Sequence, residues 1–237
     1  MPRWKAWIYS SRVLYSPRFK FLFVHIPKTG GTSLRAALKP LLYRDPLYYL
    51  MWFPQRLSNW TGHRTVTKFP RHAKIVAARE MLPQEVFAGL FKFSGVRNPW
   101  DMQVSSFHHL HKEHPGLVRG LTDFNAFVRH KLDPGRAPSA LLDISGTPQM
   151  DYLQGLHGDL LVDEVIYFEN LEAGYRRIAG KIGLKHPPVL PHRRKGRRQP
   201  DYRDYYAPET VELVAERYRK DIAAFGYAFD RPGEPGR

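Results

Sequence analysis

A lysine, two glycines and three hydroxyl residues lie together in Lys28-Thr29-Gly30-Gly31-Thr32-Ser33, and these residue types suit the binding of an anion. Glycines let the backbone approach an anionic group closely, and the amides at a helix start point toward it. The helix dipole adds partial positive charge, and the Lys28 ammonium adds a full one. The segment therefore predicts a site for an anionic ligand, such as a nucleotide.

The elements around this segment are a strand and a helix. Apolar residues over 20–26 predict a buried strand, and the leucine spacing over 32–43 predicts an amphipathic helix. The segment is not a Walker A loop, because the lysine precedes the glycines instead of following them. Since many glycine turns are purely structural, this turn alone does not establish a ligand site.

A second strand, turn and helix carry Arg97. Strand 91–96 ends just before this arginine, and Pro99 suits the first turn of helix 99–112. Because open α/β sheets bind ligands at the carboxyl ends of their strands, Arg97 is a candidate for a second anionic group. Ser105 lies two turns into the same helix. Considered alone, each of these residues also has a purely structural interpretation: Arg97 as a solvated surface charge, and Ser105 as a neutral helix residue.

Together these segments resemble the sulfotransferase superfamily, especially its carbohydrate branch of heparan sulfate 2-O-sulfotransferases and bacterial relatives. The resemblance implies a P-loop NTPase-like α/β fold, with a mostly parallel sheet covered by helices on both faces. It implies 3′-phosphoadenosine 5′-phosphosulfate (PAPS) as co-substrate, a carbohydrate or other hydroxyl acceptor, and no metal. By resemblance, the 5′ side of PAPS is held by Lys28, Thr29, Gly30, Gly31, Thr32 and Ser33, and the 3′-phosphate by Arg97 and Ser105.

The catalytic groups implied by the resemblance are Lys28 and His72. His72, in Arg71-His72-Ala73, matches the family's His-Ala element, where a histidine is the expected general base. An imidazole titrates near neutral pH, which suits this role. His63 and Glu80 are the alternatives for the base. Lys28 is expected to neutralise the charge that develops on the bridging oxygen as the nucleotide leaves.

The densest run of positive charge covers 192–198, where the resemblance predicts a loop that closes over PAPS through Arg194, Lys195 and Gly196. Such runs are usually solvated. The chain has 37 Lys and Arg against 22 Asp and Glu, a net charge of +15, which favours polyanionic partners such as PAPS or an acidic glycan. Two other functions stay open: a nucleotide-dependent kinase with a modified P-loop, and a non-catalytic basic binder of nucleic acid or glycan. A sulfotransferase is not expected to bind nucleic acid.

The length of 237 residues suits one domain, which we expect over 20–230. We predict a basic surface lead-in at 1–19, a flexible tail at 231–237 and acceptor-side insertions at 44–70 and 114–150. The other expected elements are helices 72–82 and 84–89, a helix capped by Thr122, a loop over 133–149, strand 164–168, helix 171–183 and a last helix from Pro208 to Gly226. Alternating strands and helices themselves predict a mostly parallel sheet covered on both faces.

Cysteine is missing from the sequence, which excludes disulfides, a thiol nucleophile and thiolate metal ligands. No apolar run is long enough to span a bilayer, and the N-terminus has no uninterrupted signal-like segment. We therefore expect a cytoplasmic protein of bacterial type, or a Golgi-lumen protein only if the chain is trimmed.

Overall fold

The computed structural model describes residues 14–44, 72–191 and 201–230. Within them, a four-stranded sheet has the order β1-β2-β3-β4. The strands are β1 (Leu14–Ser16), β2 (Phe21–Val24), β3 (Phe91–Val96) and β4 (Glu164–Tyr167). β1 pairs antiparallel with β2, whereas β2, β3 and β4 run parallel. The predicted mostly parallel sheet is confirmed.

Strand β1 lies within the residues 1–19 that we expected to form a surface lead-in. Its Leu14 and Ser16 are completely buried, and Leu14 pairs with Phe23 of β2. A three-residue strand is too short to show a clear alternation of apolar and polar residues, so only its pairing with β2 reveals it.

The helices in the described residues follow the strands in the expected alternation. They are α2 (Gly31–Leu42), α4 (Ile75–Met81), α5 (Gln84–Ala88), α6 (Pro99–Glu113), α7 (Phe124–Leu132), α8 (Ala140–Gly146), α9 (Met150–Leu153), α10 (Leu171–Lys181), α11 (Pro208–Arg217) and α12 (Arg219–Phe225), with 3₁₀-helices η1 (Pro115–Val118), η2 (Phe168–Asn170) and η3 (Tyr202–Tyr205).

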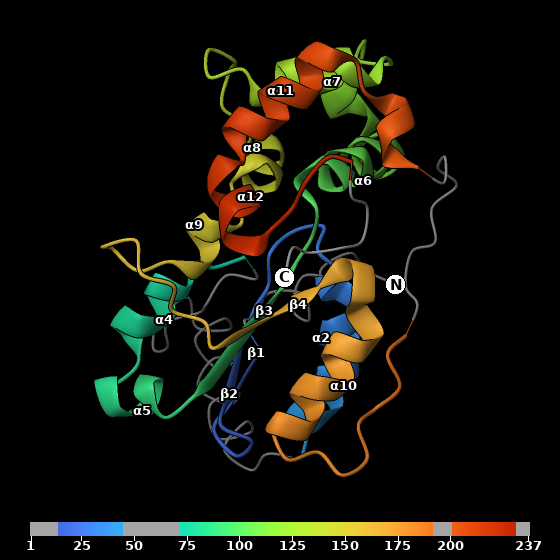
Figure 1. Ribbon diagram of the computed structural model, residues 1–237. Helices are drawn as coiled ribbons and strands as arrows, with labels where there is room; N and C mark the ends of the chain where they lie inside the picture. Colours follow the sequence, from blue (N-terminus) through green and yellow to red (C-terminus); the bar gives the residue numbers. More distant parts are fainter. Residues whose placement is uncertain (1–13, 45–71, 192–200, 231–237) are drawn as a thin grey trace, which may run out of the picture.

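Both faces of the sheet are covered because alternate residues of each strand point to opposite sides. Phe21 and Phe23 of β2 pack with the apolar residues of α2 and α10, which lie next to each other in Figure 1. Leu22 and Val24 pack on the other side with residues of α4, α5, α9 and α12. Apolar strands between two helical layers are typical of parallel sheets.

A third apolar cluster forms a helical layer beyond the carboxyl ends of the parallel strands, built mainly from α6, α7, α8 and α11 (Figure 1). Its centre holds Phe127 of α7, Val214 of α11 and Tyr218, all completely buried. Because β3 leads directly into α6, this layer lies over the edge of the sheet where the Lys28 loop, predicted to bind an anion, is found.

Three local expectations were wrong. Residues 140–146 form helix α8, although 133–149 was expected to be a loop, because the prolines and glycine before it hide a short helical segment. Asp123, not Thr122, caps α7: its carboxylate accepts a hydrogen bond from the Ala126 amide. The last helix is divided at Tyr218 into α11 and α12, although Gly226 ends it in the predicted left-handed conformation.

None of the helices in the described part of the chain combines the length and the apolar character needed to cross a membrane.

Candidate active site

The loop between β2 and α2 has an unusual backbone conformation. Lys28 has a φ of 69°, and Gly30, which precedes the first residue of α2, has a φ of 77°. Positive φ is disfavoured for residues with a Cβ and costs about 1 kcal/mol or more. Thr29 is fully buried, and its hydroxyl donates to the Ile26 carbonyl over 3.0 Å. Such turns before a helix form a concave surface of backbone amides that suits a phosphate.

Gly31, the first residue of α2, leaves room for a histidine ring that packs directly against it. A Cβ at Gly31 would lie 2.1 Å from Cδ2 and 2.3 Å from Nε2 of His25. His25 is buried, and its ring stacks on Phe23 of the strand below. The missing side chain of Gly31 therefore leaves space for the His25 imidazole and also leaves the backbone amides of the loop accessible.

His72 lies in the turn before α4, against this same histidine. Its Nδ1 is 2.8 Å from the carbonyl oxygen of His25, and the two ring centroids are 4.6 Å apart. Because a carbonyl oxygen can only accept, Nδ1 must donate the hydrogen, and a neutral His72 then carries its lone pair on Nε2. This is the tautomer that can accept a proton at Nε2. A chain of contacts thus joins His72 through His25 to Gly31.

Arg97 is buried at the carboxyl end of β3, where the sequence predicted it. Its Nε and Nη2 both contact Asp101 Oδ2, at 2.8 and 2.7 Å. Nη1 donates to the Lys28 carbonyl over 3.0 Å, and the guanidinium lies 3.9 Å from the centre of the Phe168 ring. The two predicted anion-binding segments are therefore in direct contact.

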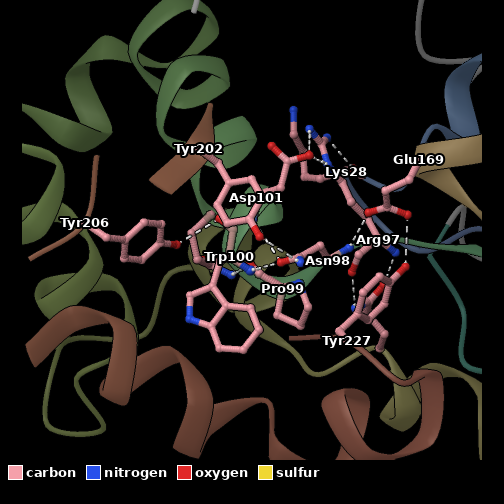
Figure 2. A network of polar contacts seen from close by, with 12 residues as sticks. Lys28, Arg97, Asn98, Pro99, Trp100, Asp101, Glu169, Tyr202, Tyr206 and Tyr227 are labelled. Atoms are coloured by element: carbon pink, nitrogen blue, oxygen red, sulfur yellow. Dashed lines mark hydrogen bonds and ion pairs between the residues drawn. The ribbon is translucent and has the colours of Figure 1, made fainter. Parts of the chain in front are cut away.

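The turn after Arg97 is held by side chains from distant parts of the chain, as Figure 2 shows. Asn98 caps α6, accepting from the Trp100 amide over 3.0 Å, and its Nδ2 donates to the Tyr202 hydroxyl over 3.2 Å. Its backbone amide donates to Glu169 Oε1 over 2.8 Å, and the Tyr227 hydroxyl donates to the other oxygen of Glu169 over 3.2 Å.

The Glu169 carboxyl lies in a partly buried position beside this turn. Burial raises the pKa of Glu169, while the Asn98 amide and the charge of Arg97 act in the opposite direction. A carboxylate here accepts hydrogen bonds from both the Asn98 amide and the Tyr227 hydroxyl. It therefore links the start of α6 to the segment after α12.

Two of the residues that bind Arg97 were not assigned a role from the sequence. Asp101 follows Arg97 by four residues, a spacing that often allows an ion pair and could have indicated this one. Phe168 and the neighbouring Glu169 reach the site from η2, after β4. No local pattern indicates that contact, because it depends on β4 pairing beside β3.

The other predicted residues are distributed as follows. Thr29 and Ser33 are buried in the loop and first turn of α2, and Thr32 is partly exposed. Ser105 is partly exposed on α6, four residues after Asp101. His63, Arg194, Lys195 and Gly196 lie outside the described residues, as do the basic run at 192–198 and most of the 44–70 segment.

Glu80, an alternative base, is a surface residue of α4. Its side chain is 62% exposed and lies 3.4 Å from Arg79. The histidines of α6 also have structural partners: His111 contacts the carbonyls of Phe107 and Leu121, and His108 contacts the Tyr205 hydroxyl. Across ranges 14–44, 72–191 and 201–230, no three His, Asp or Glu side chains are grouped so that they could hold a metal ion.

A comparison with protein families matches residues 11–228 to the family described as "Sulfotransferase family". No curated protein and no solved structure gives a match. The family match covers nearly the whole chain, and the mixed α/β fold with its mostly parallel sheet agrees with it. The family match contradicts the two alternative functions, a nucleotide-dependent kinase and a non-catalytic basic binder. The chain therefore belongs to the sulfotransferase family and is a PAPS-dependent enzyme that transfers sulfonate to a hydroxyl-bearing acceptor.

Proposed function

We propose that this enzyme transfers the sulfonate of PAPS to a hydroxyl group of a carbohydrate, with Lys28 and His72 as its catalytic residues. The observation that carries the proposal is the chain of contacts from His72 through His25 to Gly31. It connects a histidine of the correct tautomer to a loop with the features of a phosphate cradle.

The loop residues fit the 5′-phosphosulfate of PAPS. Gly31 begins α2, so the amides of the first turn are available to an anion, and Lys28 adds a cation next to them. A Cβ at Gly30 would lie 3.0 Å from side-chain atoms of Phe168 and Leu171, so this position is restricted by packing as well as by its positive φ. We assign Lys28, Thr29, Gly30, Gly31, Thr32 and Ser33 to this end of the donor.

We assign Arg97 and Ser105 to the 3′-phosphate. The support is that Arg97 joins the Lys28 loop directly, and that Ser105 follows Asp101 by one helical turn and so shares its face of α6. A planar guanidinium suits an anionic oxygen because its N–H groups form a fixed fork. Arg194, Lys195 and Gly196 remain proposed contacts from the segment outside the described residues.

In the proposed reaction, bound PAPS supplies a sulfonate whose bond to the phosphate oxygen is broken. His72 Nε2 takes the proton of the acceptor hydroxyl while the oxygen of that hydroxyl forms its bond to sulfur. Lys28 and the loop amides stabilise the negative charge left on the phosphate oxygen of the departing nucleotide. By analogy with phosphoryl transfer, catalysis is mainly the positioning of groups and the stabilisation of charge.

For the acceptor, we propose a carbohydrate that can be acidic, bound over 114–150 and 44–70. The net charge of +15 supports an acidic acceptor. Residues 131–147 line much of a cavity of about 360 Å³, to which Arg217 of α11 also contributes. Lys131 at its edge is buried and bonds to Gln103, Ser106 and the Ser145 carbonyl; burial lowers its pKa well below the usual value.

The test is a screen of neutral and uronic-acid-containing oligosaccharides with labelled PAPS, with the product sulfate located by mass spectrometry. We expect His72→Ala to lower kcat by about 10²- to 10⁴-fold, the range for loss of a general base. Lys28→Ala should lower kcat by about 10²- to 10³-fold, as for loss of an oxyanion stabiliser. The exposed His157 provides a matched control, since His157→Ala should leave transfer unchanged.

The two mutations should affect binding of the product 3′-phosphoadenosine 5′-phosphate (PAP) differently. His72→Ala should leave its affinity close to that of the wild type, whereas Lys28→Ala should weaken it, as measured by isothermal titration. If His72→Ala retains wild-type kcat, His72 is not the base; if the wild type does not bind PAP, the proposed donor site is wrong.

A further inference from the structure

We propose that Arg97 is a positioning residue for Lys28: its guanidinium holds the Lys28 peptide in its left-handed conformation and so aims the loop at the 5′ end of the donor. This inference rests on the proposed function. It gives Arg97 a role that does not depend on whether a 3′-phosphate is present.

The first support is the conformation of Lys28 itself. It is a non-glycine residue with a φ of 69°, in a region that such residues occupy only when their surroundings hold them there. Its carbonyl oxygen accepts a hydrogen bond from Arg97 Nη1 over 3.0 Å. Because this carbonyl belongs to the peptide that joins Lys28 to Thr29, the bond fixes the orientation of that peptide. The orientation of the next amide, that of Thr29, is fixed with it.

The second support is that Arg97 is itself held rigidly. Asp101 Oδ2 contacts both Nε and Nη2, and the ring of Phe168 covers one face of the guanidinium at 3.9 Å. The backbone amide of Arg97 donates to Gln149, whose side-chain amide donates back to the Arg97 carbonyl, both over 2.8 Å. With only 4% of the residue exposed, Nη1 has little freedom to leave the Lys28 carbonyl.

The geometry of the guanidinium also distinguishes positioning from a simple effect of its charge. One planar group reaches Asp101 on one edge and the Lys28 carbonyl from another nitrogen. A lysine at position 97 would keep the positive charge but has no fork that could make both contacts at once. Charge and positioning can therefore be separated by comparing Arg97→Lys with Arg97→Ala.

Two nucleotides distinguish the two roles. PAP carries both the 5′-phosphate and the 3′-phosphate, whereas adenosine 5′-phosphate (AMP) lacks the 3′-phosphate. If Arg97 contacts only the 3′-phosphate, its removal affects PAP and leaves AMP unchanged. If Arg97 positions the Lys28 loop, its removal weakens both nucleotides.

The experiment measures the binding of PAP and AMP to the full chain by isothermal titration. We expect Arg97→Ala to weaken AMP about tenfold or more, the effect of losing a hydrogen bond from a charged donor, and to weaken PAP further. Arg97→Lys should recover part of the affinity for PAP but not that for AMP. Ser105→Ala is the matched comparison: it lies on the same proposed 3′-phosphate side, and it should weaken PAP far more than AMP.

A rate measurement covers the case in which AMP binds too weakly to the wild type. The release of PAP from saturating PAPS, with water as acceptor, should have a kcat about ten- to a hundredfold lower in both Arg97→Ala and Arg97→Lys. Thermal unfolding shows which variants are folded. If Arg97→Ala does not fold, Arg97→Lys provides the test instead.

The outcomes are distinct. Arg97 variants that bind AMP as tightly as the wild type, or that raise KM for PAPS at an unchanged kcat, would overturn the positioning role and leave the proposed function intact. A wild type that binds neither nucleotide would overturn the proposed function itself.

Discussion

Replacing Gly31 by alanine tests the contact between the Lys28 loop and the two histidines, His25 and His72. The new Cβ would lie 2.1 Å from His25 Cδ2 and 2.3 Å from its Nε2. Ordinary van der Waals contact begins near 3.4 Å, so the His25 ring has to withdraw by roughly 1 Å. This ring is buried between Phe23 and His72, and the carbonyl of the same residue orients His72.

The expected effect on stability is small. Overpacking a buried site typically costs about 1–3 kcal/mol. Alanine at the first position of α2 recovers up to about 1 kcal/mol, because glycine is the poorer helix former. The free energy of unfolding should therefore fall by about 0–3 kcal/mol.

The expected effect on catalysis is much larger. If the ring of His25 is displaced by about 1 Å, His72 moves with it, and a misplacement of that size can cost about a hundredfold in rate. We therefore expect kcat to fall about a hundredfold in a protein that remains folded.

The assay measures kcat at saturating PAPS with the acceptor found in the screen, together with urea unfolding. Gly180→Ala is the matched control: this glycine lies in α10, and no atom beyond its own stretch of helix lies within 4 Å of where its Cβ would stand, so the variant should keep wild-type activity. The double variant His25→Ala, Gly31→Ala should lose less free energy of unfolding than the sum of the losses in the two single variants, because the clashing ring is gone.

An unchanged kcat in Gly31→Ala would refute this reasoning. If kcat is unchanged while PAP binding is weakened, Gly31 serves only the nucleotide, and its contact with His25 has no effect on His72, the proposed base.

Three further predictions concern stability. Burial raises the pKa of Asp221 to about 6, so the folded state binds its proton more readily than the unfolded chain; the contribution of this carboxyl to the free energy of unfolding should be highest below about pH 4, fall by up to about 3 kcal/mol between pH 4 and 6, and then level off. Asp221→Asn should remove most of this slope in urea titrations across that range, and an identical slope in the variant would contradict the assignment. Asp123→Ala should cost about 1 kcal/mol in urea unfolding by removing the cap of α7, whereas Thr122→Ala should change stability by only a few tenths; equal effects would mean that the cap contributes nothing. Gly174→Ala should cost about 1–3 kcal/mol because its Cβ would lie 2.6 Å from Ile166 Cγ2, whereas Gly180→Ala on the same helix should be neutral or stabilising; a stable Gly174→Ala would show that α10 can move away from the sheet.

Much of the fold could be predicted from local sequence. Strand 91–96 has the expected bounds because an apolar run is followed by a residue pair, Asn98-Pro99, that caps and starts a helix. The family was also accessible, because the two strand-turn-helix segments carry their distinctive residues within short stretches. These predictions succeed because the conformational preference of each residue agrees with the local structure in which it lies.

The sequence predicted the residues of the candidate site and placed its two anion-binding segments at strand ends facing one crevice, but it did not predict the contacts between them. Lys28, His72 and Arg97 were named from short motifs, whereas the bond between Arg97 and Lys28 joins residues 69 positions apart. The contact of His72 with the His25 carbonyl joins residues 47 positions apart. Strand β1, helix α8 and the role of Glu169 were likewise not visible in the sequence.

The physical reason lies in how the strands pair. The residue types alone determined that a lysine follows one strand and an arginine follows another. Parallel pairing of β2 with β3, in which Val24 lies opposite Ser94, brings the two strand ends to the same edge of the sheet. Only this register decides that the guanidinium meets the Lys28 carbonyl, because a shift of one residue would turn each side chain to the other face.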